Sequence, residues 1–404
     1  AHRAPHIPSS TYDPIRRGIA GLTLALLLTE RGLPCRVFER CAEPAEVGAG
    51  LLVAANALRV YRTVGLEQTL MEAGAPLRRG SIVRHDGRVL SSVDVARLSE
   101  DLGVASLGMH RGTFFGALLR AVSPELLVLG EELVAVEERP GAVRARFASG
   151  RVEEGALLVG ADGIHSVVRK LVDGEDWRPP RDAGESCWRG LAPEGCVGDD
   201  DPARWSFTES WGDSVRVGLI PVGGGLLSWH VYFRPHTEPF PDEGAGPRSA
   251  EAQARLRRRF GEILAGWHAP IPAIVAAGDY DGLLRTENRD RPPTRRWSRG
   301  RAVLLGDALH PITPNIGQGA ALAIEGAAAL ARACATERDV GAVIARYQRE
   351  RRLRVAAVTQ LSALVGRWAS TGSRVKRGLR DAGTQATPQW LAVACSKAIY
   401  GYDG

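Results

Sequence analysis

The spacing of apolar and polar residues predicts alternating helices and strands at the start of the chain. Apolar residues at helical spacing, opened by glycines, predict a helix over Ile19 to Arg31, and Pro34 to Glu39 is typical of a short strand. Asn56 to Ala73 has the period of an amphipathic helix. Leu77 to Val95 alternates around Asp86-Gly87 as a β-hairpin does.

Further along, strands give way to helices. The predicted elements are a helix over Arg111 to Ala121, short strands over Leu126 to Gly160 with turns at Pro140-Gly141 and Ser149-Gly150, an antiparallel meander over Trp188 to Phe233, a strand over Ala302 to Leu305, and helices from Gln318 onwards. Aromatic residues of the meander are expected in the core before they line a binding cage, namely Trp211, Trp229, Tyr232 and Phe233. A β-rich middle between two α/β segments predicts two interleaved domains.

Composition excludes a disordered or fibrous protein. The chain has 404 residues, 44% hydrophobic and 24% charged, which is ordinary for a globular fold. Its formal charge of +6 comes almost entirely from scattered arginines. Two short clusters, Arg257 to Arg259 and the set Arg349, Arg351, Arg352 and Arg354, are predicted on solvated helix faces, so no nucleic-acid partner is expected.

The cysteines and the apolar runs exclude two further classes. The six cysteines form no pair or cluster with metal-ligand spacing, so no metal site is expected. Leu22 to Leu28 is far shorter than the roughly 20 residues of a membrane span, and no signal-cleavage site follows it. We therefore expect a cytoplasmic protein without a membrane partner.

Glycines before the first predicted helix form an incomplete dinucleotide-binding motif. The frame G-x-G-x-x-G falls on Arg16, Gly18 and Gly21, so the first glycine is replaced. Glu39 closes the next strand 18 residues after Gly21, where a carboxylate accepts hydrogen bonds from ribose hydroxyls. Prolines and polar residues precede Gly18, and we expect them not to form a central parallel strand. Alone, this motif fits any glycine-capped helix equally well.

Two further motifs place a carboxylate at the C-terminal end of a strand. Leu157 to Arg169 runs from a buried strand into a tight turn with Asp162 at its tip, and a helix follows. Leu304 to Gly319 repeats this arrangement with Asp307. Glycines permit close approach of the backbone there, and open α/β sheets bind ligands at this end. Either aspartate alone fits a turn cap, whereas the two together favour a cofactor site.

These motifs resemble those of the single-component, FAD-dependent aromatic hydroxylases, also called class A flavoprotein monooxygenases, which have the para-hydroxybenzoate hydroxylase fold. The resemblance covers Gly18 to about residue 365. It implies an α/β fold in which a three-layer, Rossmann-like FAD-binding domain with a parallel sheet is interleaved with a β-sheet substrate domain and followed by C-terminal helices. The implied boundaries are residues 1–75, 108–176 and 295–335 for the FAD-binding domain, 76–107 and 177–294 for the substrate domain, and 336–404 for the helices.

The resemblance also implies the residues that bind FAD. The first glycine motif and Glu39 would hold the ADP half, Arg111 would contact the phosphate or ribityl region, and Asp307 the ribityl chain. Asp162 and Arg169 belong to a motif implicated in both FAD and NAD(P)H binding. Gly48-Ala49-Gly50-Leu51 and Asn56 resemble the flavin-proximal segment. The implied cofactor-binding residues are Gly18, Gly21, Glu39, Arg40, Gly50, Arg111, Asp162, Arg169, Gly306, Asp307, Pro314, Gly317, Gln318 and Gly319.

The implied reaction is a monooxygenation. NADPH or NADH would reduce FAD, O2 would add at flavin C4a, and the hydroperoxide would transfer oxygen to a small aromatic or polyketide-like substrate. Gly317-Gln318-Gly319 would direct the positive end of a helix at the pyrimidine side of the flavin, and Pro314 would line one side of the site. The protein is expected to be a monomer or a homodimer.

Arg189, His310 and Pro314 are the candidate catalytic residues. Cys187 to Leu191 resembles a segment of the urate, salicylate and hydroxybenzoate hydroxylases, in which Arg189 would pair with a carboxylate or an acidic ring, although an exposed structural arginine fits equally. His310 is expected to cap its loop rather than to transfer a proton, and Gln318 and Glu325 are expected to be structural.

Three classes of function remain open at this point. The first is the NAD(P)H-consuming hydroxylase. The second is another flavin oxidoreductase of the same fold, such as an epoxidase or a reductase. The third is a cofactor-poor, non-enzymatic homologue, which the substitution of Arg16 for the first glycine keeps open.

Overall fold

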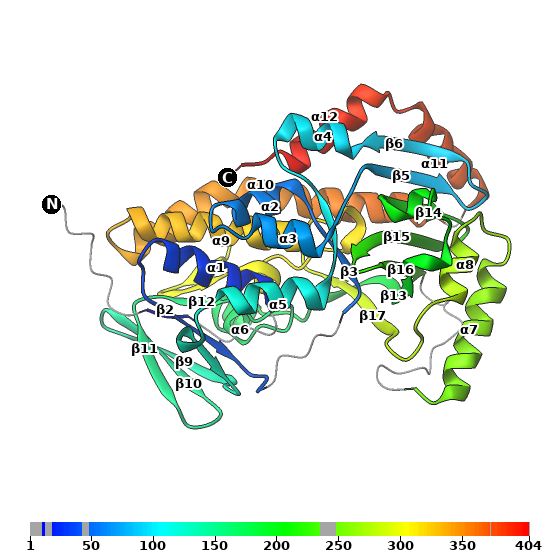
Figure 1. The fold of residues 1–404 in the computed structure, drawn as a ribbon. Helices are drawn as coiled ribbons and strands as arrows, with labels where there is room; N and C mark the ends of the chain where they lie inside the picture. Colours follow the sequence, from blue (N-terminus) through cyan, green and yellow to red (C-terminus); the bar gives the residue numbers. More distant parts are fainter. Residues whose placement is uncertain (1–9, 13–17, 43–47, 235–247, 372, 404) are drawn as a thin grey trace.

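The computed structural model describes residues 10–12, 18–42, 48–234, 248–371 and 373–403, and within them the strands form one large and four small sheets (Figure 1). The small sheets are β1 (Ser10–Tyr12), β2 (Cys35–Glu39) and β8 (Leu127–Leu129); β12 (Leu158–Gly160), β19 (Ala302–Leu304) and β18 (Ser298–Arg299); β3 (Gly50–Val53), β7 (Leu107–His110) and β4 (Ala75–Pro76); and β11 (Val152–Gly155), β10 (Ala142–Phe147) and β9 (Leu133–Arg139). The first two sheets contain parallel pairs. The predicted α/β class is confirmed.

A short strand precedes the first helix. Residues Ser10–Tyr12 form β1, which pairs in parallel with Cys35, Arg36 and Val37 and lies beside β12. A parallel strand thus does form before Gly18, but it is the edge strand of its sheet, so the prediction that this segment makes no central parallel strand is not contradicted. Thr and Tyr favour strands, and a three-residue strand ends before Pro14 removes a backbone donor. Arg16 lies outside the described residues.

The predicted helix over Asn56 to Ala73 is two helices, α2 (Ala55–Arg62) and α3 (Glu67–Ala73). Between them the chain turns through Gly65 at φ +72°, a left-handed conformation that glycine adopts without steric cost. The prediction of one continuous helix is wrong because this turn interrupts the apolar period.

An alanine-rich helix is packed among three other helices. α9 (Gly319–Thr336) packs against α1 (Ile19–Glu30), α2 and α10 (Val340–Ala369), and its small side chains let three helices approach it closely. Further helices are α4 (Val95–Leu102), α5 (Arg111–Ala121), α6 (Val167–Asp173), α11 (Arg374–Ala386) and α12 (Gln389–Tyr400). α11 and α12 lie against β6 near the top of Figure 1.

The large sheet has the strand order β17-β13-β16-β15-β14-β5-β6. Its strands are β17 (Leu284–Asp290), β13 (Arg181–Pro193), β16 (Leu226–Phe233), β15 (Val215–Gly223), β14 (Ser206–Trp211), β5 (Arg79–Arg84) and β6 (Val89–Asp94). The meander prediction holds for β14 to β16 only, because β13 pairs with β16 rather than with β14. β14 instead takes β5 of the predicted hairpin as a parallel neighbour.

The two faces of this sheet differ in polarity. The register places Trp188, Val231 and Val217 on one face, which packs against α7 (Ala250–Leu264) and α8 (Ile271–Ala276). The other face, called here the polar face, carries Cys187, Arg189, Ser228, His230, Tyr232, Arg216, Glu209 and Trp211. The four aromatic residues expected in the core are all buried, but Tyr232 and Trp211 lie on the polar face.

The polar face meets the small sheet β3-β7-β4 at glycines. A Cβ atom on Gly108 of β7 would lie 2.0 Å from the carbonyl oxygen of Pro221 in β15, and one on Gly50 of β3 would lie 2.6 Å from Cβ of Ser228. The backbone N–H of Gly50 donates to Oγ of Ser228 at 2.8 Å. Two backbones thus approach so closely that no side chain fits between them.

We expect Gly108→Ala to destabilise the protein by about 2 kcal/mol or more, because the carbonyl it meets belongs to a strand and cannot move aside. Urea unfolding measures this. Gly261→Ala is the control, since Gly261 lies within α7 with no atom near its missing Cβ, and alanine there should stabilise by about 0.5 to 1 kcal/mol. Equal effects of the two substitutions would contradict the close approach.

Candidate functional site

The start of α1 is an uncapped helix end. Gly18 is its N-cap and offers no side chain to the first backbone N–H groups, while Gly21 is buried one turn later. A Cβ on Gly306 would lie 3.0 Å from Cβ of Ala20, so the loop after β19 lies directly against this helix start. The positive end of α1 and its free donors favour an anionic group.

The strand after α1 ends in the predicted carboxylate. Glu39 is buried at the end of β2, and its Oε1 accepts a hydrogen bond from the backbone N–H of Cys41 at 2.9 Å. Arg40 is exposed. Contacts of either residue with a nucleotide stay predictions.

Asp162 caps a turn with one carboxylate oxygen and leaves the other without a partner. Its Oδ2 accepts hydrogen bonds from the backbone N–H groups of Val167 and Val168 at 2.6 and 3.3 Å, so it caps the turn before α6. Its Oδ1 is buried and has no partner. Burial raises the pKa of this carboxyl, and the hydrogen bonds oppose the rise. An unpartnered buried oxygen suits a ligand that brings its own donor.

Arg169 connects the two aspartate motifs. Its Nε donates to Oδ2 of Asp173 at 2.6 Å, and its guanidinium also donates to the carbonyl oxygens of Ala308 and Leu309 at 3.2 and 2.8 Å. The observed contacts fix the loop that follows Asp307. A direct contact of Arg169 with a cofactor stays a prediction.

Asp307 lies at an accessible position near a positive charge. Gly306 adopts φ +61°, and the residue that follows it, Asp307, is exposed. Surrounding protein atoms nevertheless raise its pKa by desolvation, and the charge of Arg111 opposes the rise. A Cβ on Gly48 would lie 2.7 Å from Cβ of Arg111. The structure therefore brings together three sequence-predicted positions, Gly48, Arg111 and Asp307.

The loop before α9 carries the other predicted glycines. Gly317 has φ +63°, Gly319 begins α9, and Pro314 opens a short 3-10 helix, Pro314–Ile316. Gln318 is fully buried, and its Oε1 accepts a hydrogen bond from Nδ2 of Asn56 at 2.9 Å. Its own amide nitrogen has no partner.

A buried ion cluster lies beneath this loop. Glu325 accepts from Nδ2 of Asn56 at 2.5 Å and forms ion pairs with Arg351 and Arg354. The prediction of a solvated face for the second arginine cluster is wrong at Arg351, whose side chain is fully buried because Glu325 supplies its counter-charge. The structural role expected of Gln318 and Glu325 matches these contacts.

His310 is buried behind the loop rather than at its surface. Both of its ring nitrogens lack a partner, so it does not cap the loop through its side chain. Desolvation lowers its pKa to about 4, and the nearby charge of Arg351 acts in the same direction. The imidazole is therefore neutral at physiological pH.

The polar face of the large sheet holds Arg189 without a carboxylate. Its guanidinium donates to Oγ1 of Thr286, and within the described part of the chain it forms no ion pair. Tyr232 and His230 of β16 face it, and desolvation together with the charges of Arg189 and Arg216 lowers the pKa of His230 to about 3. A partly exposed cation beside two aromatic rings can bind an anionic aromatic ligand.

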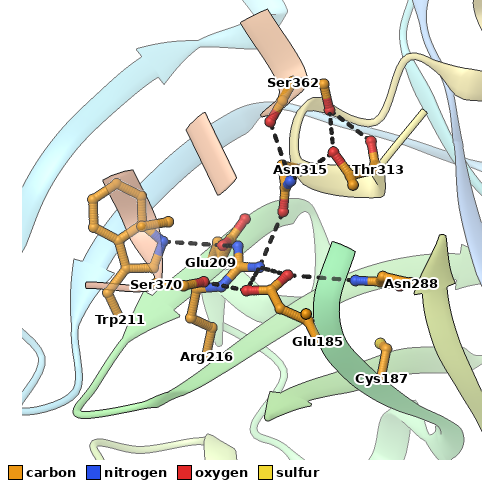
Figure 2. Close-up of polar contacts among 12 residues, drawn as sticks. Glu185, Cys187, Glu209, Trp211, Arg216, Asn288, Thr313, Asn315, Ser362 and Ser370 are labelled. Carbon is orange, nitrogen blue, oxygen red and sulfur yellow. Dashed lines mark hydrogen bonds and ion pairs between the residues drawn. The ribbon is translucent and has the colours of Figure 1, made fainter. Parts of the chain in front are cut away.

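A second arginine of this face was not predicted from the sequence. Arg216 is buried, and its guanidinium donates to Glu209 at 2.7 Å and to Glu185 at 2.9 Å (Figure 2). It also donates to Oδ1 of Asn315 at 3.0 Å and lies 4.5 Å from the ring centroid of Tyr232. The sequence signal that could have identified Arg216 is a charged residue between Val215 and Val217, in a strand of mostly apolar residues.

Asn315 extends this cluster to α10. Its amide nitrogen donates to Oγ1 of Thr313 at 2.9 Å and to the carbonyl oxygen of Ser362 at 3.1 Å (Figure 2). Ser370 at the end of α10 donates to Glu185. The loop that carries Pro314 and Gly317 is thereby joined to both the large sheet and α10.

The described residues contain neither a candidate metal site nor a helix that could span a membrane. No group of three or more His, Cys, Asp or Glu suitable for a metal ion occurs among the described residues. Across the same part of the chain, no helix has the length and apolar character needed to span a membrane.

Comparison with known proteins identifies the family of the chain. Residues 17–362 match a family described as an FAD binding domain. The chain is 38% identical over 331 residues to the aurachin C monooxygenase/isomerase of Stigmatella aurantiaca, covering 82% of each protein. It is 36% identical over 314 residues to the 3-amino-4-hydroxybenzoate 2-monooxygenase of Streptomyces cremeus, covering 76% of this chain and 74% of that protein.

A solved structure extends the similarity to the whole fold. The structure of Klebsiella pneumoniae HpxO complexed with FAD and uric acid superposes with a TM-score of 0.85 at 26% sequence identity, over 97% of each chain.

We expect His310 to make the protein sensitive to acid. Its pKa in the folded state, about 4, lies below the ordinary value near 6.5, so the unfolded chain takes up this proton first. The stability that depends on neutral His310 is complete above about pH 6.5 and is lost as the pH falls toward 4, amounting to about 2 kcal/mol at pH 5.

Urea unfolding at about pH 7.5 and pH 5 tests this expectation on wild type and His310→Gln, since glutamine cannot titrate. The variant should lose about 2 kcal/mol less than wild type between these conditions. His85→Gln, at an exposed position, is the control and should retain the wild-type difference. Identical losses in wild type and His310→Gln would refute the expectation.

Proposed function

Because the chain belongs to the family of FAD-dependent aromatic monooxygenases, we propose that it hydroxylates a small aromatic compound that carries an acidic group, bound against the polar face of the large sheet. The protein is an FAD-dependent monooxygenase, and NAD(P)H is the reductant typical of its family. The acidic group and the residues that bind each ligand are the proposed part.

The residues around the start of α1 and in the two aspartate motifs fit FAD. We place the diphosphate at the uncapped start of α1 beside Gly18, and the ribose near Glu39. Asp162 Oδ1, which lacks a partner, and the accessible carboxylate of Asp307 are suited to accept hydrogen bonds from the cofactor. FAD would supply the redox chemistry that activates O2, and the chain supplies position and electrostatics.

The observation that carries the proposal is the contrast between two arginines on one face. Arg216 is neutralised by Glu185 and Glu209, whereas Arg189 has no carboxylate and is partly exposed. Arg189 is thus free to bind a carboxylate or a phenolate, and Tyr232 lies beside it. The name of the Streptomyces cremeus relative, a hydroxybenzoate monooxygenase, supports an aromatic acid.

Proton chemistry on this face is restricted. Desolvation raises the pKa of Tyr232 and lowers that of His230, so both are neutral at physiological pH. Neither is suited to deprotonate a phenol. We propose instead that Arg189 stabilises the ionised form of the substrate, so that no protein base is needed.

Two further proposals concern the cellular location and the oligomeric state of the protein. The described cysteines are all free, and NAD(P)H consumption requires a compartment that supplies it, so we propose a cytoplasmic location. A monomer or a homodimer remains the prediction for the oligomeric state.

Arg189→Gln tests the anionic substrate. With FAD-loaded protein, we expect KM for an aromatic acid such as a hydroxybenzoate to rise about 10-fold to 100-fold, since a charge-assisted hydrogen bond is lost. KM for the matching neutral amide should change less than about 3-fold. Substrate-dependent NAD(P)H consumption and mass analysis of the product provide the measurement.

Arg289→Gln in the neighbouring strand is the control, because Arg289 is exposed and pairs with Glu287. It should leave both KM values unchanged. An equal rise in KM for the acid and the amide in Arg189→Gln would contradict the charge contact, and a hydroxylated product formed without O2 would contradict monooxygenation.

Asp307→Asn tests the cofactor site. We expect the affinity of the apoprotein for FAD to fall about 10-fold or more, because the amide is a weaker acceptor than the carboxylate. Titration of FAD fluorescence measures it. Asp86→Asn, in the exposed turn between β5 and β6, is the control and should bind FAD as wild type does. Unchanged affinity in Asp307→Asn would exclude this carboxylate from the site.

A further inference from the structure

A small cavity lies behind the loop that follows Asp307. Its walls are the segment from Arg291 to Trp297, Leu309 and His310 of the loop, and one side of α10 from Arg352 to Thr359. It has room for about one water-sized body. None of the residues proposed above to bind FAD or the substrate lines this cavity.

Polar atoms that line this cavity lack hydrogen-bond partners. They are Nε of Arg291, Oγ1 of Thr359 and both ring nitrogens of His310. The three residues are 6%, 4% and 3% exposed, so bulk water does not satisfy these atoms. Unpartnered polar groups in a protein interior cost free energy, and several around one cavity indicate that something polar occupies it.

Arg291 is an exception among the buried arginines. Within the described residues, the others have carboxylate partners: Arg169 with Asp173, Arg216 with Glu185 and Glu209, Arg351 with Glu325, and Arg380 with Asp381. Arg291 donates only to the carbonyl oxygen of Arg178 and lies 5.9 Å from the ring centroid of Trp177. A buried charge without a counter-charge is strongly unfavourable.

The charged groups around Arg291 leave a net positive charge. Desolvation lowers the pKa of Arg291 and the charge of Arg169 acts in the same direction, whereas Asp173, which already pairs with Arg169, opposes them. Arg352 is exposed at the cavity wall, and no acidic residue lines it. Glu325 already serves two arginines, Arg351 and Arg354. Asp173 is thus shared between the guanidinium groups of Arg169 and Arg291, and one carboxylate does not balance two positive charges.

We propose that this cavity binds a chloride-sized anion, held by the guanidinium of Arg291, the hydroxyl of Thr359 and an N–H of His310. A water molecule would satisfy the hydrogen bonds but not the charge, and a phosphate is too large for the space. The anion links α10 to the loop from Asp307 to Pro311. This loop also contacts Arg291 directly, because the carbonyl oxygen of Pro311 accepts a hydrogen bond from the backbone N–H of Arg291 at 3.2 Å.

Bromide and chloride provide two independent tests on the FAD-loaded protein. Crystals soaked in sodium bromide should show an anomalous peak in the cavity beside Nε of Arg291. In solution, raising chloride from about 10 to about 500 mM at constant ionic strength, with gluconate as the replacement, should raise the melting temperature by about 2 °C or more.

Variants assign the effect to this cavity. Arg291→Gln and Thr359→Val should each lose at least half of the chloride-dependent shift, because each removes a donor. Arg289→Gln is the matched control, since it removes an exposed arginine two positions away and should retain the full shift. If Arg291→Gln does not fold, Thr359→Val and the bromide map still decide the matter.

Three results would overturn the proposal. They are a bromide map without a peak in the cavity, a melting temperature that does not distinguish chloride from gluconate, and a chloride shift that persists unchanged in Thr359→Val and Arg291→Gln. A peak without any chloride-dependent stabilisation would mean an adventitious ion only. None of these measurements depends on the identity of the substrate.

Discussion

The guanidinium of Arg216 is the contact on which the arrangement of the site depends. It bridges Glu209 and Glu185 of two other strands and reaches Asn315 of the loop before α9. Removal of one partner from such a buried cluster leaves an unpaired charge and typically costs about 3 to 5 kcal/mol. The sheet and the loop can therefore change their relative position only if the whole cluster rearranges. The sheet and the loop are thus joined by charge pairing and hydrogen bonds rather than by apolar packing alone.

The glycines have the complementary role of bringing backbones together. Gly50 and Gly108 let the small sheet β3-β7-β4 touch the large one, and Gly306 lets the loop of Asp307 approach the start of α1. These close contacts and the Arg216 cluster together fix the relative positions of the sheets, the loop and α1. A side chain at any of the three glycines would push these elements apart.

Local features of the site could be predicted from the sequence, whereas pairings between distant segments could not. Asp162 and Asp307 stand out because a strand, a glycine and a carboxylate follow one another within a few residues. The break at Gly65 and the short strand at Ser10–Tyr12 were missed because apolar periodicity does not report where a helix is interrupted or how short a strand can be. The pairing of Arg351 with Glu325, 26 residues away, was missed because an arginine at helical spacing looks the same whether a carboxylate or water faces it.

Unpaired arginines carry the most information about ligands in this fold. Arginine stays charged at any physiological pH, so a buried guanidinium without a carboxylate cannot escape its desolvation cost by losing a proton. Arg189 is partly exposed, so water can solvate its guanidinium when no ligand is bound. Arg291 is buried beside a cavity of water-molecule size and shares the charge of Asp173 with Arg169. Exposure thus separates the two arginines: the proposed ligand of Arg189 can exchange with water, whereas the proposed ligand of Arg291 would be part of the folded structure.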